Sequence, residues 1–215
     1  MMVFSIWGIF MKSRVLQLTA ALLLGGALTG CSTVGGTFYT ASYSSVSDAG
    51  YTIPAIPNEK IPQQYRRQIV KYQTNEVPGT IIVETGEKFL YLVQPDGKAM
   101  RYGIGVGREG FGWNGTARVA MKREWPTWTP PSAMIKRQPE LAKYRNGMGP
   151  GLKNPLGARA LYLYNKGGDT GYRIHGTPEW WSIGKAMSSG CVRMMNQDII
   201  DLYERTEQGA KVIVR

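Results

Sequence analysis

The hydrophobic positions in the C-terminal part of the chain cluster in short runs of β-branched and aromatic residues. Residues 80–84 and 88–93 form two such runs around a turn that contains Gly86, a pattern that predicts neighbouring strands. The turn signal Gln-Pro-Asp-Gly at 94–97 predicts a hairpin that returns through residues 100–106. Further strands are predicted at 116–121, 160–164, 172–174 and 212–214.

One helix is predicted near the C-terminus. Asn196 is placed as its N-cap and Asp198 in its first turn, hydrophobic residues follow at helical spacing, and the helix ends near Gly209. Several short strands and one late helix predict a mainly β domain, either a β-sandwich or a curled sheet with an appended helix. Residues 123–157 are rich in Pro, Gly and Trp and show little periodicity. A loop of that length in a compact domain usually carries function, so we expect a substrate lid.

The N-terminal part reads as an export signal. Lys12 and Arg14 form a basic region, and residues 15–27 form an apolar run that is too short for a spanning helix and ends on small residues. The first ten residues add nothing that this signal needs, so translation starts at either Met1 or Met11.

The signal ends in Leu-Thr-Gly-Cys at 28–31, which resembles the bacterial lipoprotein signal. That resemblance implies that Cys31 is lipidated and becomes the mature N-terminus; the alternative is an ordinary signal peptide with an incidental cysteine. Residues 32–58 are rich in Ser, Thr, Gly, Tyr and Pro and low in charge, which is typical of a flexible tether. Residues 62–73 fit either a short helix or an extended arm.

These features divide the chain into three parts. Residues 1–30 are predicted to be a lipoprotein signal peptide, residues 31–78 a lipidated N-terminus with a flexible tether, and residues 79–215 a catalytic domain. The formal charge of +11 falls to +9 when Lys12 and Arg14 leave with the acid-free signal. The basic residues are scattered, and an exported protein rarely meets nucleic acid, so we expect an anionic wall polymer or lipid headgroups as partners and no nucleic acid.

A thiol and an imidazole supply the candidate chemistry. His175 is the only histidine and Cys191 is one of two cysteines. A thiol and a nearby base are the two parts of a cysteine nucleophile. The alternative is a buried thiol and an incidental histidine. If Cys31 carries lipid, Cys191 is the only thiol left, no intramolecular disulfide forms, and an idle thiol is unexpected in an oxidising compartment. One histidine and one free cysteine cannot assemble a typical metal site, so no metal or cofactor is expected.

Residues 172–194 resemble the signature of the L,D-transpeptidases, the family named for the YkuD domain. The matching elements are His-Gly-Thr at 175–177 and Ser-Ser-Gly-Cys-Val-Arg at 188–193, and the resemblance extends over the predicted β domain. Ser189 stands where many members have histidine, and the turn at 113–116 replaces the family's Thr-Pro-x-Gly. The resemblance implies a β-sandwich-like L,D-transpeptidase domain with one C-terminal helix and a long lid loop.

The family's activity implies a reaction on peptidoglycan stem peptides. Cys191 would attack the carbonyl of the third stem residue, usually diaminopimelate, expel the terminal D-alanine, and pass the thioester to an amine. His175 would move the proton, and the backbone N–H groups of Gly190 and Cys191 would bind the oxyanion. Alternatives are a hydrolase or carboxypeptidase of the same fold and a non-catalytic wall-binding lipoprotein; the intact pair argues against the last.

Four further residues are candidates for substrate binding. Arg193 either holds a substrate carboxylate or braces the loop through backbone carbonyls. Ser188 either bonds the catalytic pair or turns the chain, and Tyr172 either lines the pocket or is a half-buried strand tyrosine. Gly176 is expected to allow close backbone approach. Because no acid adjoins the motif, a backbone carbonyl or a serine is expected to orient His175.

The same reasoning sets the expected partners and location. The acceptor amine belongs either to a neighbouring stem peptide, which gives wall crosslinks, or to an outer-membrane protein, which gives protein–wall attachment. Ser32 follows the lipidated cysteine where inner-membrane retention would require aspartate. The expected location is therefore the periplasmic face of the outer membrane, with the lipid holding the protein to that membrane.

Overall fold

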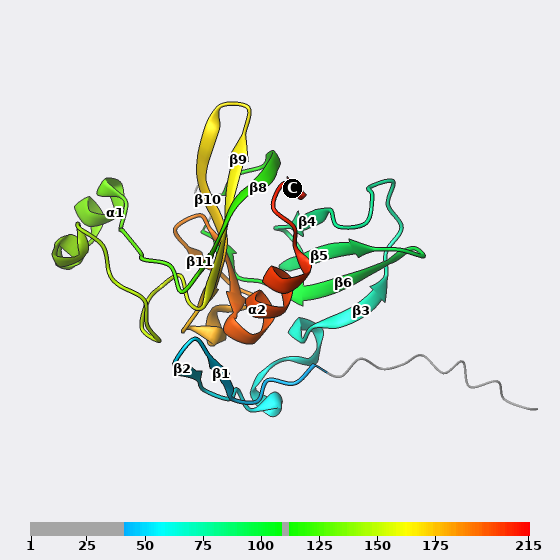
Figure 1. Ribbon diagram of the computed structural model, residues 1–215, viewed down its shortest axis with the longest axis horizontal. Coiled ribbons are helices and arrows are strands. Elements are labelled where there is room, and N and C mark those ends of the chain that lie inside the picture. Colours follow the sequence, from blue (N-terminus) through cyan, green and yellow to red (C-terminus); the bar gives the residue numbers. More distant parts are fainter. Residues whose placement is uncertain (1–40, 109–111) are drawn as a thin grey trace, which may run out of the picture. The chain divides into compact units, whose positions relative to one another are not determined.

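The computed structural model describes residues 41–108 and 112–215 (Figure 1). The strands are β1 Val46–Asp48, β2 Tyr51–Ile53, β3 Gln68–Lys71, β4 Ile81–Glu84, β5 Phe89–Gln94, β6 Lys98–Gly103, β7 Val106–Gly107, β8 Gly115–Glu124, β9 Arg159–Asn165, β10 Gly168–Thr177, β11 Ala186–Ser188, β12 Val192–Met195 and β13 Lys211–Val214. The helices are α1 Ser132–Arg137 and α2 Asn196–Arg205, with short 3₁₀ turns η1 Asn58–Lys60, η2 Gln63–Tyr65, η3 Pro139–Tyr144 and η4 Trp180–Ser182. The mainly β prediction is confirmed.

Nine strands form one mixed sheet in the order β12-β10-β9-β8-β13-β4-β5-β6-β3. The pairs β10–β12 and β13–β4 are parallel, and the other neighbours are antiparallel. The predicted hairpin is present as β5 and β6, with Gln94 opposite Lys98. Its turn depends on two residues with left-handed backbone, Asp96 at φ 61° and Gly97 at φ 63°, which are residue types that tolerate this conformation.

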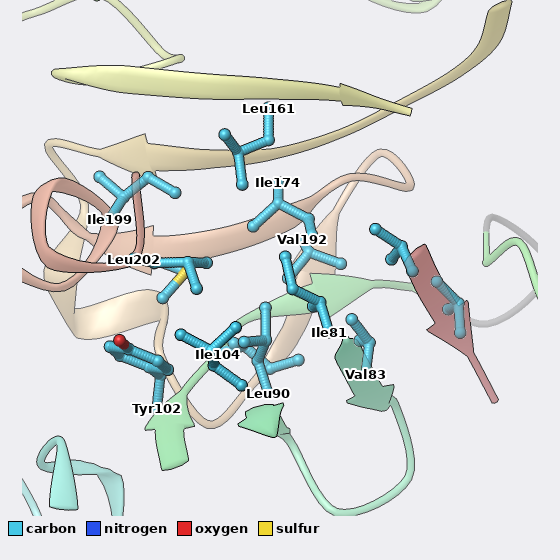
Figure 2. Packing of buried hydrophobic residues seen from close by; sticks show 14 of the residues in the cluster. Ile81, Val83, Leu90, Tyr102, Ile104, Leu161, Ile174, Val192, Ile199 and Leu202 are labelled. Atoms are coloured by element: carbon cyan, nitrogen blue, oxygen red, sulfur yellow. The ribbon is translucent and has the colours of Figure 1, made fainter. Parts of the chain in front are cut away.

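The main hydrophobic core joins the two ends of this sheet, so the sheet curls over itself. Its members labelled in Figure 2 include Leu161, Ile174 and Val192 from the β9–β10–β12 end and Ile81, Leu90 and Ile104 from around β4, β5 and β6. Ile199 and Leu202 of α2 enter the same cluster, and both are fully buried. Each such side chain contributes about 1.5–3 kcal/mol through burial, which fixes α2 against the strands.

The start of α2 differs from its prediction. The helix begins at Asn196, so Met195 occupies the cap position and Asn196 is the first helical residue. The Asn196 side chain instead accepts a hydrogen bond from the backbone N–H of Ala158 at 2.9 Å. Strand β12 runs directly into α2 without a linker, which leaves the Asn196 amide free to hold the chain before β9. The helix ends at Arg205, earlier than Gly209.

The described part of the predicted tether is folded, so that prediction is wrong for residues 41–78. Strand β3 pairs antiparallel with β6 and extends the main sheet. Tyr43, Ile56 and Ile61 are buried in a second cluster with Ile183 and Met195. These apolar residues show no helical or strand period in the sequence, yet each is buried against the rest of the domain. Residues 31–40, the signal and Cys31 lie outside the described residues.

Two polar anchors hold this N-terminal segment. At the first, Arg159 donates to both carboxylate oxygens of Asp48, at 2.6 and 2.9 Å, and the indole N–H of Trp125 donates to the same carboxylate at 2.8 Å. The Arg159 side chain is 4% exposed, and its hydrogen bonds hold the pKa of Asp48 below the usual range.

The second anchor joins the segment to α2. The Tyr43 hydroxyl donates to Asp198 at 3.1 Å and accepts from the backbone N–H of Arg67 at 2.7 Å. The Arg67 guanidinium lies 3.2 Å from Asp201. Burial raises the pKa of Asp198 to about 7, against the opposing effect of Arg67. The residues upstream of position 79 are therefore part of the folded domain.

The segment 123–157 is organised around a buried amide. The side-chain nitrogen of Asn154 donates to the backbone carbonyls of Pro126, Met148 and Gly149 at 2.9–3.1 Å. In Figure 1 its helix α1 lies on the side of the domain opposite β5 and β6. Within the described residues, no helix has the length and apolar character needed to cross a membrane.

The Asp48–Arg159 pair gives a test of the folded N-terminal segment. Asp48→Asn should lower the free energy of unfolding at pH 7 by about 3 kcal/mol, because it leaves a buried guanidinium without its main partner. The expected loss is at the low end of the range for breaking a buried ion pair, because the Glu124 carboxylate remains 3.8 Å from the Arg159 guanidinium. The difference should shrink as the pH falls through the carboxyl range, where the stabilisation by the depressed pKa of Asp48 is lost.

Urea unfolding measures this difference, with Asp96→Asn as the matched control, because Asp96 is exposed and asparagine tolerates its φ of 61°. Equal stability of the Asp48 variant and the wild type would mean that residues 41–78 are a loose tether after all.

Candidate functional site

The candidate nucleophile and base lie on neighbouring parallel strands. In the register of β10 and β12, Ile174 pairs with Val192 and His175 with Arg193. Cys191 immediately precedes β12, and the backbone N–H of Arg173 acts to lower the pKa of its thiol, against the larger effect of burial. Because side chains alternate along a strand, Ile174 enters the core while His175 faces the other side of the sheet. The structure therefore places His175 within β10 and Cys191 directly before the neighbouring strand β12.

The ring of His175 is oriented by a backbone carbonyl, as expected. Nδ1 lies 2.6 Å from the carbonyl oxygen of Gly176, and His175 is 5% exposed. A carbonyl oxygen only accepts hydrogen bonds, so Nδ1 carries the proton in this contact. The lone pair of the neutral ring is then on Nε2, which is the nitrogen available as a base.

Both groups are held in their neutral forms. Burial lowers the pKa of His175 to about 4; the Gly176 carbonyl opposes this, whereas the positive charges of Arg193 and Arg173 add to it. Burial also raises the pKa of the Cys191 thiol, which the Arg173 N–H and the same two arginines oppose. At pH 7 the site therefore holds a thiol beside a neutral imidazole, which suits proton removal by a general base during attack.

Ser188 closes the turn that presents the thiol. Its hydroxyl donates to the backbone carbonyl of Cys191 at 2.6 Å and accepts from the N–H of Gly190 at 3.2 Å. Of its two predicted roles, the structure shows the turn and not a bond to the catalytic side chains. Gly190 has a φ of +132°, which favours glycine. Its N–H is directed at Ser188, so the oxyanion role of Gly190 is weakened, and that of the Cys191 N–H stays a prediction.

Arg193 has a partner that neither prediction named. Its guanidinium donates to Glu179 at 2.8 Å, and both side chains are partly exposed. The sequence held one signal for this pair, because Glu179 is the only acid between Asp169 and Asp198. The sequence did not indicate where the Glu179 side chain points, because its orientation depends on the 3₁₀ turn η4 that follows it.

Gly176 serves the packing of α2. A Cβ atom there would collide with the side-chain oxygen of Asn196 and would lie 3.0 Å from Ile199 and 3.1 Å from the N–H of Ala158. The residue is buried against the start of α2. The expectation of a close approach is correct, and the approaching group is the helix. The substrate-binding role of Gly176 stays a prediction.

A cavity of about 440 Å³ opens beside the catalytic turn. Gly190 and Val192, the two neighbours of Cys191, are among its lining residues, and Tyr172 lines it as well. The Tyr172 ring stacks on Trp113 with centroids 5.6 Å apart, and its role in substrate binding stays a prediction. No residue of 123–157 lines this cavity, and the role of that segment as a lid stays a prediction.

Metal ligands do not gather in the described residues: no group of three or more His, Cys, Asp or Glu side chains there could hold an ion. The described site instead contains a thiol, an imidazole whose tautomer is fixed by a backbone carbonyl, and a cavity lined by the two neighbours of Cys191. These are the components that acyl transfer through a thioester requires.

Comparison with known proteins gives a consistent family. The family model for the L,D-transpeptidase catalytic domain, YkuD, matches residues 78–214. The probable L,D-transpeptidase YbiS of Escherichia coli K12 is 35% identical over 143 residues, which cover 61% of this chain and 43% of YbiS. The probable L,D-transpeptidase ErfK/SrfK of the same organism is 32% identical over 136 residues, which cover 61% and 42%. The chain thus spans less than half the length of these relatives.

Among solved structures, one from Brucella melitensis is 45% identical and covers 74% of this chain and 99% of its own, with a TM-score of 0.50. That protein is described as a probable carnitine operon oxidoreductase, caia. Its name describes a different activity from that of the curated relatives.

The protonation state of the base can be measured directly, because His175 is the only histidine. Ring ¹⁵N and ¹H NMR should show a titration midpoint near pH 4 and the Nδ1–H tautomer above it. Since the folded pKa is lowered, the corresponding stability is present above the unfolded value of about 6.5 and is lost as the pH falls towards 4. The urea-unfolded protein is the control and should titrate near 6.5. A folded midpoint at or above 6.5 would contradict the neutral pair.

Proposed function

Because this chain belongs to the L,D-transpeptidase catalytic-domain family, YkuD, we propose that it is a cysteine-dependent transpeptidase acting on peptidoglycan stem tetrapeptides. The observation that carries the proposal is the position of Cys191 directly before β12, which pairs with the strand that holds His175, together with the bond from Nδ1 of His175 to the Gly176 carbonyl. This contact leaves Nε2 as the base for the thiol. A protein that only bound the wall would gain nothing from a buried, oriented imidazole beside a thiol.

In the proposed reaction, Nε2 of His175 takes the thiol proton as the Cys191 sulfur attacks the carbonyl carbon of the third stem residue. The tetrahedral oxyanion accepts a hydrogen bond from the Cys191 N–H, an interaction worth about 3 kcal/mol in the transition state. The imidazolium then gives its proton to the amine of D-alanine, the C–N bond breaks, and a thioester remains. The backbone N–H of Arg173 and the positive charge of Arg193 favour the developing thiolate.

The second half of the reaction repeats these steps in reverse. His175 takes a proton from the incoming amine, which attacks the thioester carbon, and the thiol leaves as it is reprotonated. A diaminopimelate side chain as acceptor gives a wall crosslink, and an amine on an outer-membrane protein gives attachment of that protein to the wall. Water in the same position gives the alternative, a carboxypeptidase. The two outcomes differ only in the nucleophile, so products distinguish them.

The location is proposed from the leader alone. Lipid on Cys31 would hold the protein at the periplasmic face of the outer membrane, where stem peptides are the available substrate. Cys31 lies outside the described residues, and the folded segment 41–78 means that the domain begins well before the family match at residue 78.

Defined tetrapeptide muropeptides test the reaction. The wild type should release D-alanine, carry the acyl group on Cys191, and form crosslinked product when an amine is present. Cys191→Ala should abolish both steps, and His175→Ala should slow acylation by about 10²- to 10⁴-fold, the usual contribution of a general acid–base group. Mass spectrometry of the products and of the intact enzyme measures these steps. Release of D-alanine by Cys191→Ala would refute the mechanism, and release without transfer would favour the carboxypeptidase.

The lipid anchor gives a separate prediction. Cys31→Ser should move the protein from membrane to soluble fractions in cells while its rate on soluble muropeptides stays within a factor of two of the wild type. The reason is that Cys31 precedes the folded domain, whose anchors at Asp48 and Arg67 remain intact. Fractionation and the muropeptide assay measure the two effects. An unchanged membrane fraction would show that lipid on Cys31 does not anchor the protein.

A further inference from the structure

The cavity beside the catalytic turn is positively charged. Lys88, Arg108 and Arg173 line it, and no Asp or Glu is among its lining residues in the described chain. The rest of the wall is largely apolar or aromatic, including Val106 and the stacked Trp113. Such a wall lowers the local dielectric, so a charge inside the cavity interacts with these cations more strongly than it would in water. The cavity therefore favours an anionic group.

One of the three cations already has its own counterion. The Arg173 guanidinium makes two hydrogen bonds of 2.7 Å to the carboxylate of Asp169 and lies 4.2 Å from the centre of the Tyr162 ring. Its charge is therefore largely neutralised, and its role is to form the wall beside the thiol. The excess positive charge of the cavity comes from Lys88 and Arg108.

Lys88 occupies a position where lysine is unfavourable. Its φ is +64°, a left-handed conformation that glycine adopts without strain. The side chain lines the cavity, and its ammonium donates to the carbonyl of Thr85 at 2.6 Å and to that of Gly86 at 3.4 Å. An ammonium has three donors, so one remains for a ligand. Backbone strain of this kind is typical of functional sites.

Arg108 is fixed to the catalytic turn through its backbone. Its N–H donates to the carbonyl of Ser188 at 3.0 Å, and the hydroxyl of Ser188 bonds the carbonyl of Cys191. Arg108 is exposed, and its guanidinium has no hydrogen-bond or ion-pair partner among residues 41–108 and 112–215. Two hydrogen bonds through Ser188 therefore link the backbone of Arg108 to the backbone of Cys191.

We infer that this cavity binds the terminal carboxylate of the departing D-residue, with Arg108 and Lys88 as specificity-determining residues. The inference rests on the proposed function and adds the groups that recognise the substrate's end. The terminal residue carries a single negative charge, since its amine is in the scissile amide. The side-chain end of diaminopimelate carries an ammonium as well as a carboxylate, and the ammonium is disfavoured among these cations. The terminal carboxylate is also only one residue from the carbonyl that Cys191 attacks.

Three synthetic tetrapeptides separate the carboxylates of the stem. The first has all its free acids, the second ends in D-alaninamide, and the third has D-isoglutamine at position two. The variants are Arg108→Gln and Lys88→Gly, the latter relieving backbone strain at φ +64° while removing the charge. Lys136→Gln is the matched control, an exposed lysine on α1 that does not line the cavity.

The wild type should acylate the free acid about 10- to 100-fold faster in kcat/KM than the D-alaninamide peptide, the range for hydrogen bonds to a charged group. Arg108→Gln should lose most of this preference through KM, so that its kcat/KM on the free acid falls towards that on D-alaninamide, and Lys88→Gly should lose part of it. The isoglutamine peptide should behave like the free acid with every variant. Lys136→Gln should match the wild type throughout.

Equal slowing of all three peptides by Arg108→Gln would overturn the inference, since it would assign Arg108 to positioning of the turn. A preference that follows the isoglutamine peptide would overturn it in favour of the other carboxylate. Calorimetric binding to Cys191→Ala separates this inference from the proposed function. Tighter binding of the free acid, lost on adding Arg108→Gln, supports the cavity assignment even if the wild type turns over no peptide. Absence of that difference refutes it.

Discussion

The parallel pairing of β10 with β12 is the constraint on which the site depends. One face of this pair is fixed by Ile174 and Val192 in the core, and that burial sets the register. A slip of one residue would exchange the two faces of β10, placing His175 among the core side chains and Ile174 on the face that His175 now occupies. The hydrophobic core thus fixes the relative positions of the strand segments that carry the candidate catalytic residues.

Helix α2 packs against the β10–β12 strand pair. It follows β12 without a linker, and the absence of a side chain at Gly176 lets it approach β10 closely. The carbonyl that this glycine contributes is the group that sets the tautomer of His175. One residue therefore satisfies a packing requirement and an electrostatic one, which explains why any side chain there would affect both stability and the base.

The sequence predicted the strands and the late helix and identified the candidate catalytic pair, because each has a local signal. Strand periodicity reports burial on one face, and the Cys and His residues stand in a specific motif. It failed where the controlling partner is remote in the chain. The fold of residues 41–78 depends on contacts such as Tyr43 with Asp198, and the partner of Arg193 depends on the turn that carries Glu179. The prediction for Gly176 came from its position next to His175, whereas the steric constraint on it comes from the side chain of Asn196.

Strand β3 has a consequence for the behaviour of the chain outside its own fold. It pairs with β6 at the last position of the nine-stranded sheet and covers that edge. A polypeptide that began at residue 78, where the family match begins, would leave the backbone of β6 open. An open edge pairs readily with strands of other molecules. The upstream segment therefore keeps β6 paired on both sides and moves the open edge of the sheet to the four-residue strand β3.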